Sequence, residues 1–203
     1  MDGLPVLPSY GLPELTARLA RRGAAPDAPS TERQAAVAAI LRAPDGGGDA
    51  EILLMRRADR LGDPWSGHMA LPGGRREPGD PSLAATAIRE TREEVGLDLE
   101  AHGALLARLP DTPAVARGAR VGMVIAPFVF ALRESLALSP NEEVAEALWT
   151  PIGPFARGER AGTIPYPHQG ATMDLPCLLV GERIVWGLTY QMLQALFVTL
   201  HSA

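Results

Sequence analysis

The segment from Gly73 to Leu97 restricts the fold more than any other part of the sequence, because it sets a tight turn directly before a helix. Its first two residues are glycines, which adopt positive φ and allow another backbone to approach closely. Asp80 is a favourable N-cap residue, Pro81 suits the first helical position, and Gly96 is the residue type that commonly follows a helix. The sequence therefore predicts a helix from Pro81 to Val95, with apolar residues three and four apart on its core-facing side.

Short apolar runs elsewhere predict strands. The runs at 35–41 and 51–56 flank a cluster of Pro, Asp and Gly, which predicts a β-hairpin. Pro127 predicts a bend in its strand or an edge position for it. Strands, one helix, more strands and a last helix predict a mixed α/β layered fold. The remaining predicted elements are strands at 68–74, 103–109, 121–132, 144–152 and 171–180, and a closing amphipathic helix at 187–203.

Length and composition predict one domain and exclude several protein classes. A chain of 203 residues can bury one core, so we expect a domain over 35–203, preceded by an N-terminal extension over 1–34 with a short helix near 13–22. The formal net charge of −5 gives no reason to expect nucleic acid as a partner. Cys177 is alone, which excludes a disulfide framework and a thiolate-rich metal site. With no signal-peptide pattern and no apolar stretch of roughly 20 residues, we expect a cytoplasmic protein without a membrane span.

The predicted helix carries three glutamates on one side. Glu90, Glu93 and Glu94 are separated by three and four positions, and like charges at that spacing destabilise an exposed helix by about 0.2–0.5 kcal/mol a pair. A divalent cation such as Mg²⁺, which takes oxygen ligands, would offset this repulsion, and the glycine turn could bring a backbone carbonyl close to it. The alternative is an ordinary solvated helix with surface ion pairs. The turn, the cap and the three glutamates together favour the metal site.

This segment resembles the signature of the Nudix hydrolases. "RETREEVGL", from Arg89 to Leu97, matches the second half of that signature, with Thr91 in an aliphatic position. Counted from Gly74, the acidic residue is Asp80 instead of Glu, and eight residues instead of seven separate it from Arg89. The lengthened turn, with "LLMRRADRLGDPWSGHMALPGG" before it and "VWGLT" near the end, resembles the branch of coenzyme A pyrophosphatases.

The resemblance implies a fold, a cofactor and a set of site residues. The fold would be a Nudix-type α/β/α sandwich with a mixed β-sheet, and the cofactor Mg²⁺ or Mn²⁺. Glu90 and Glu94 would be the main metal ligands, with Glu93 and the Gly73 carbonyl as additional ones, and Arg89 would orient a ligating glutamate. The general base would be Glu142 or Glu143, or alternatively Glu93. Substrate contacts are expected from Arg56, Arg57, Gly74 and Arg75. The alternatives for the arginines are solvated turn residues and, for Arg57, a structural ion pair.

The resemblance also implies an activity. The expected reaction is the metal-dependent hydrolysis of the diphosphate bond of coenzyme A or acyl-coenzyme A, to 3′,5′-ADP and 4′-phosphopantetheine or its acyl derivative. One alternative is the same chemistry on ADP-ribose, a dinucleotide or another nucleoside diphosphate derivative. A second is a regulatory module that binds a nucleotide without hydrolysing it. The expected partner is a small nucleotide-like molecule, and a homodimer is compatible with this reading.

Overall fold

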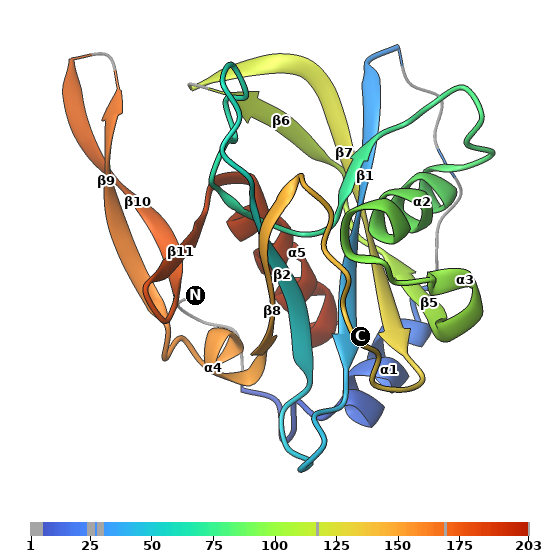
Figure 1. The fold of residues 1–203 in the computed structure, drawn as a ribbon. Helices are drawn as coiled ribbons and strands as arrows, with labels where there is room; N and C mark the ends of the chain where they lie inside the picture. The colour runs from blue at the N-terminus through green and yellow to red at the C-terminus, as the bar shows by residue number, and fades with distance from the viewer. Residues whose placement is uncertain (1–5, 24–26, 28–30, 117, 169, 203) are drawn as a thin grey trace.

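The computed structural model describes residues 6–23, 27, 31–116, 118–168 and 170–202. It forms a mixed α/β fold, which confirms the predicted class (Figure 1). The helices are α1 (Leu12–Ala20), α2 (Leu83–Val95), α3 (Leu99–His102), α4 (Gly153–Ala156) and α5 (Gly187–His201). The strands are β1 (Arg33–Arg42), β2 (Glu51–Arg57), β3 (Met69–Ala70), β4 (Gly73–Arg75), β5 (Gly103–Arg108), β6 (Thr112–Ala116), β7 (Ala119–Leu132), β8 (Val144–Pro151), β9 (Ala161–His168), β10 (Ala171–Val180) and β11 (Arg183–Trp186).

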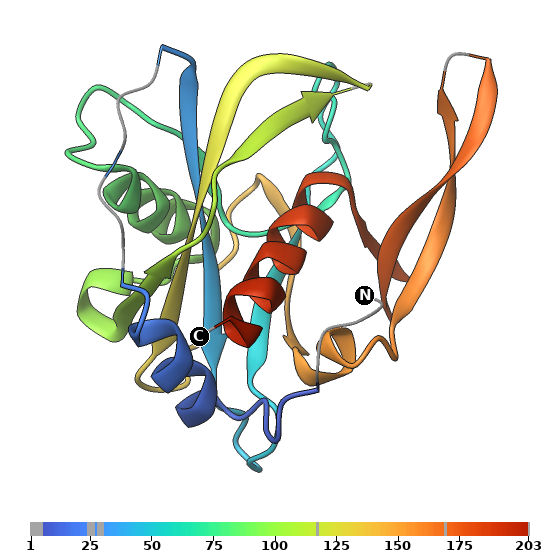
Figure 2. The ribbon, with the colours of Figure 1, turned by 180° about the vertical axis from the view of Figure 1, so that it is seen from behind.

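The larger sheet is mixed, and the predicted hairpin is part of it. β1 and β2 pair antiparallel, while β1 pairs with β7 in parallel. The strand order along the larger sheet is β3-β2-β1-β7-β5. In addition, β4 pairs with β1, β6 with β7 and β8 with β2. A smaller sheet, in the order β11-β10-β9, extends away from the body as a ribbon (Figures 1 and 2). Sequence reasoning did not predict β6, β9, β11, α3 or α4.

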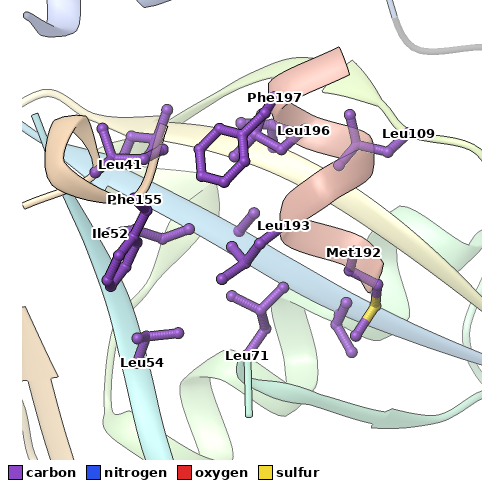
Figure 3. Packing of buried hydrophobic residues seen from close by; sticks show 14 of the residues in the cluster. Leu41, Ile52, Leu54, Leu71, Leu109, Phe155, Met192, Leu193, Leu196 and Phe197 are labelled. Atoms are coloured by element: carbon purple, nitrogen blue, oxygen red, sulfur yellow. The ribbon is translucent and has the colours of Figure 1, made fainter. Parts of the chain in front are cut away.

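Two apolar clusters hold helices against opposite faces of the larger sheet. Odd-numbered residues of β1 such as Val37 pack on the side of α5, and even-numbered residues such as Ala38 pack on the side of α2. Figure 3 shows the α5 side, where Leu193, Leu196 and Phe197 meet side chains of β1 and β2. Both faces of β1 are therefore buried, which explains its nearly continuous apolar sequence.

Pro127 lies inside the sheet and not at its edge, so the edge alternative is wrong. It pairs with Val37 of β1 on one side of β7. On the other side, β7 changes its partner from β6 to β5 near this residue, and the Leu109 N–H donates to the Pro127 carbonyl at 2.9 Å. The missing proline N–H therefore falls where the neighbouring strand changes, and β7 is visibly bent (Figure 2).

The predicted helix α2 begins two residues later than expected. Ser82 is the N-cap, because its hydroxyl accepts a hydrogen bond from the Ala85 N–H at 3.1 Å, so the assignment of Asp80 as N-cap is wrong. Gly96 ends the helix in the left-handed conformation, as predicted. Because Ser82 caps the helix, the Asp80 carboxylate is available to accept hydrogen bonds from Arg89.

Helix α1 packs against the domain near the end of α5. Leu15 and Leu19 of α1 are fully buried. The Arg18 guanidinium donates to the Leu200 carbonyl at 3.4 Å. The division between an extension at 1–34 and a domain at 35–203 stays a prediction. Within the described part of the chain, every helix is too short or too polar to cross a membrane.

Candidate active site

Glu94, near the end of α2, has a buried carboxylate that contacts the turn between β3 and β4. The residue is only 3% exposed, and its Oε2 accepts a hydrogen bond from the Gly73 N–H at 2.8 Å. Burial raises the pKa of Glu94 to about 7, an effect that this hydrogen bond opposes and the nearby charge of Glu90 reinforces. Glu94 therefore places a costly negative charge inside the molecule, where a cation would favour the ionised form.

Glu90 lies one helical turn before Glu94 and fits against Gly74. A Cβ atom at position 74 would lie 2.4 Å from the Glu90 carboxyl carbon, so only glycine leaves room for this side chain where it stands. Burial raises the pKa of Glu90, although its ion pair with Arg89, at 3.0 Å, opposes that shift. The two carboxylates of α2 thus lie beside the two glycines of the turn.

Gly73 is required by the backbone itself. Its φ is +149°, and a Cβ atom there would lie 2.2 Å from the Ala36 carbonyl oxygen. The absence of that atom lets β4 pair with β1 at Val37. Gly73 is therefore held both by strand pairing with β1 and by the hydrogen bond from its N–H to Glu94.

Arg89 joins the helix to the preceding turn. Its guanidinium donates two hydrogen bonds to the Asp80 carboxylate, both at 3.0 Å, and one to the Arg75 carbonyl at 3.0 Å. Asp80 also accepts hydrogen bonds from the Glu77 N–H and the Thr86 hydroxyl. The hydrogen bonds from Arg89 lower the pKa of Asp80 well below its usual range, and those to Asp80 raise the pKa of Arg89. Asp80 is thus the anchor that holds Arg89 in place.

We expect Asp80→Asn to destabilise the protein by about 2 kcal/mol at neutral pH, because it removes the charge of the most buried of the three carboxylates that pair with Arg89. The folded pKa lies well below the unfolded value near 4, so the contribution of Asp80 is complete above the unfolded value, declines below it and is lost as the pH falls through the folded pKa. Urea unfolding of both proteins at pH 7 and pH 3 should therefore show a difference that shrinks in acid.

Glu14→Gln is the matched control, because Glu14 makes a single, more exposed ion pair with Arg18 on α1. It should change the unfolding free energy by about 0.5 kcal/mol or less. An Asp80→Asn protein as stable as this control would contradict the anchoring role.

The two carboxylates line a cavity of about 610 Å³. Its volume is within the range of small-molecule sites. Residues from the 57–65 segment, the glycine turn, α2, β7 and α5 contribute to its walls. Its charged lining residues are Arg57, Arg60, Asp63, Arg75, Glu90, Glu94 and Glu143. Acidic and basic groups therefore meet in one concave site.

Glu143 reaches this cavity because its segment is tied to both walls. The Asn141 N–H donates to the Glu94 carbonyl at 2.9 Å, and the Ala58 N–H donates to the Glu143 carbonyl at 2.8 Å. The Glu143 carboxylate forms an ion pair with Arg60 at 3.0 Å. The backbone thus brings a third carboxylate to the site from a distant part of the sequence.

Asp63 is a site residue that sequence reasoning missed. Its carboxylate accepts hydrogen bonds from Arg57, the shorter at 2.8 Å, and from the Trp65 N–H at 3.0 Å. Burial alone would raise the pKa of Asp63, but these two donors lower it below its usual value. Asp63 therefore fixes Arg57 at the cavity wall. No motif marked it, because it lies in an irregular segment between two strands.

The other predicted site residues are distributed unevenly. Gly73, Gly74, Arg57, Arg75, Glu90, Glu94 and Glu143 line the cavity, whereas Glu93, Glu142, Arg56 and Arg89 are not among its lining residues. The Glu93 side chain is 53% exposed and pairs with Arg89 at 3.1 Å. Arg56 lies 3.7 Å from Asp59, and Glu142 is exposed. Three residues of the quoted "VWGLT" segment, Trp186, Leu188 and Thr189, also line the cavity.

The donor set fits a hard divalent cation that also binds substrate oxygens. Among the described residues, no three His, Cys, Asp or Glu side chains gather closely enough to hold a metal by themselves. Glu90 and Glu94 nevertheless offer two partly or fully buried carboxylates at one cavity, each with its pKa raised by burial. Mg²⁺ is usually bound by one or two carboxylates plus waters and phosphate oxygens. The roles of Glu93 and of the Gly73 carbonyl as ligands stay predictions.

Comparison with known proteins identifies the family. The model of the NUDIX domain matches residues 32–164. The chain therefore belongs to the Nudix family, as the turn and helix sequence predicted. A crystal structure of a NUDIX hydrolase from Alicyclobacillus acidocaldarius has the same fold, with a TM-score of 0.53 and 20% identity over 86% of this chain and 95% of that one.

Two curated relatives are more similar in sequence. The mitochondrial coenzyme A diphosphatase of Homo sapiens is 33% identical over 68% of this chain. An uncharacterised protein of Schizosaccharomyces pombe is 40% identical over 50% of this chain. The matched regions cover 58% of the human protein and 32% of the yeast protein.

Proposed function

We propose that this protein is a metal-dependent pyrophosphatase that hydrolyses the diphosphate bond of coenzyme A or acyl-coenzyme A. The observation that carries the proposal is one cavity, in a Nudix domain, that combines the carboxylates Glu90 and Glu94 with the arginines Arg57, Arg60 and Arg75. The name of the human relative supports coenzyme A as the substrate. The upstream sequence from Leu53 to Gly74 resembles the coenzyme A branch. Its part from Arg57 to Gly74 contributes many of the residues that line the cavity.

Each charged group has a part in this reaction. Glu90 and Glu94 would hold Mg²⁺ or Mn²⁺, which when bound neutralises phosphate charge and makes water a better nucleophile. Arg57, kept in place by Asp63, would bind phosphate oxygens through its planar guanidinium. Arg89 would keep α2 and the glycine turn in register through Asp80 and the Arg75 carbonyl.

Glu143 is the favoured general base among the candidates. It lines the cavity with Glu90 and Glu94, whereas Glu142 and Glu93 do not. Its carboxylate would accept a proton as the oxygen of water forms a bond to phosphorus and the bridging P–O bond breaks. The products are 3′,5′-ADP and 4′-phosphopantetheine or its acyl derivative.

The test is a substrate panel with Mg²⁺ or Mn²⁺, with products separated by chromatography. The panel contains coenzyme A, an acyl-coenzyme A, ADP-ribose, NADH and nucleoside triphosphates. Coenzyme A compounds should have the highest kcat/KM and release 3′,5′-ADP. Faster hydrolysis of ADP-ribose or NADH would assign the site to another nucleoside diphosphate derivative. Nucleotide binding without any hydrolysis would favour a regulatory module.

A further inference from the structure

Part of the cavity is lined by uncharged residues that the proposed phosphate chemistry does not use. Met123 and Ile125 of β7, together with Leu188, Thr189 and Met192 of α5, line it on the α5 side of the sheet. Figure 3 shows Met192 at one end of the row of α5 side chains that pack on the sheet. This apolar wall, defined by these five residues, takes no part in the proposed phosphate chemistry.

The apolar wall offers a ligand almost no polar side chain. Of the described residues that form it, none is charged. Its one hydroxyl, on Thr189, donates to the Met69 carbonyl at 2.9 Å and is buried. A phosphate or a sugar placed here would lose its hydration without gaining hydrogen bonds, which is unfavourable. The wall therefore selects for an apolar part of a ligand.

Aromatic rings border the apolar wall. Trp186 lines the cavity, and its ring centroid lies 4.9 Å from that of His68 and 5.6 Å from that of Tyr166. Both contacts are tilted, at 52° and 48°. Burial lowers the pKa of His68, which favours its neutral form. The aromatic border thus continues from Trp186, beside α5, to Tyr166 of β9.

We infer that the apolar wall binds a flexible apolar chain attached to the substrate, namely the acyl group of a coenzyme A thioester. This inference rests on the proposed function and names the preferred substrate within it. A chain fits better than a nucleobase, because a base is normally recognised by hydrogen bonds to side chains as well as by stacking, and the one side-chain donor of this wall, the Thr189 hydroxyl, already donates to Met69. Met123 and Met192 have unbranched, adaptable side chains that accommodate chains of different shape.

The test compares kcat/KM for free, acetyl- and hexanoyl-coenzyme A under the same metal conditions. Burial of the additional methylene groups should raise kcat/KM of the hexanoyl compound above that of the acetyl compound by about tenfold to a hundredfold. Equal values for all three would overturn the inference and leave the proposed function standing. Hydrolysis of ADP-ribose but of no coenzyme A compound would overturn both.

Variants of the wall locate the effect. Met192→Gln keeps the length of the side chain but makes it polar, and should reduce the hexanoyl-to-acetyl ratio by about fivefold or more. Met123→Gln should do the same from β7 and serves as the second variant if the first is unstable. Val198→Gln is the control, because Val198 lies on α5, is 50% exposed and is not a lining residue. An unchanged ratio in both methionine variants, with folding confirmed by circular dichroism, would overturn the assignment.

Discussion

Glu94→Gln should lower kcat on the order of a thousandfold while leaving the protein folded. Glutamine has the size of glutamate and its carbonyl oxygen can still accept the Gly73 N–H, but it lacks the charge that a divalent cation requires. Metal-assisted stabilisation contributes several kcal/mol to such reactions, and each 1.4 kcal/mol corresponds to a factor of ten in rate. Steady-state kinetics on the best substrate of the panel measures this loss.

The stability of the same variant gives an independent readout. Because burial raises the folded pKa of Glu94 to about 7, ionising it costs stability at any pH above its unfolded value near 4, and most of all above pH 7. Glutamine removes that cost. The melting temperature of Glu94→Gln in a chelator at pH 8 should therefore equal or exceed that of the parent protein.

Two further substitutions serve as comparisons for Glu94→Gln. Glu93→Gln changes a carboxylate on the same helix that is 53% exposed and pairs with Arg89, so it should lower kcat much less. Glu100→Gln changes an exposed residue of α3 and should leave kcat unchanged. Unaltered kinetics in Glu94→Gln would contradict the assignment of Glu94 as a ligand.

Gly74→Ala should also lower activity, by about a hundredfold, and again without unfolding the domain. The added Cβ atom would lie 2.4 Å from the Glu90 carboxyl carbon, and the end of a flexible side chain can move away where a backbone atom cannot. Glu90 would be displaced from the cavity, and a misplacement of about 1 Å in a catalytic group can cost about a hundredfold in rate. Kinetics and a melting curve measure the two effects separately.

The turn contains its own matched control. Gly79 has no neighbouring atom within 4 Å of an added Cβ and does not adopt positive φ, so Gly79→Ala should leave kcat and stability unchanged. At Gly73, by contrast, a Cβ atom would meet the Ala36 carbonyl oxygen at 2.2 Å, and alanine there should unfold or expel β4. A Gly74→Ala enzyme as active as Gly79→Ala would show that the position of Glu90 does not matter.

Local sequence signals predicted the parts of this fold that local physics controls. The hairpin of β1 and β2, the helix α2 and its glycine C-cap follow from apolar spacing and from the backbone preferences of Gly and Pro. The first turn of α2 was misjudged, because Asp80 and Ser82 are both good N-caps and only the tertiary contact with Arg89 decides between them. The edge position of Pro127 was misjudged, because the change of partner along β7 is a long-range property.

The candidate site likewise contains residues that the sequence could predict and residues that it could not. Glu90, Glu94 and the two glycines belong to one continuous segment, so their spacing alone indicated their proximity. Asp63 and the apolar wall come from separate elements with no motif, and their side chains meet only through sheet topology. Helical spacing also does not determine burial, which is why Glu93 faces solvent while Glu94 is enclosed by the turn.

An anomalous difference map from crystals grown with Mn²⁺ and a non-hydrolysable diphosphate tests the central claim most directly. The claim is that Glu90 and Glu94 hold a divalent cation against the substrate at the Gly73–Gly74 turn. It predicts a manganese peak between these two carboxylates, in contact with phosphate oxygens inside the cavity. A map with the diphosphate bound and no metal at Glu90 or Glu94 would contradict it.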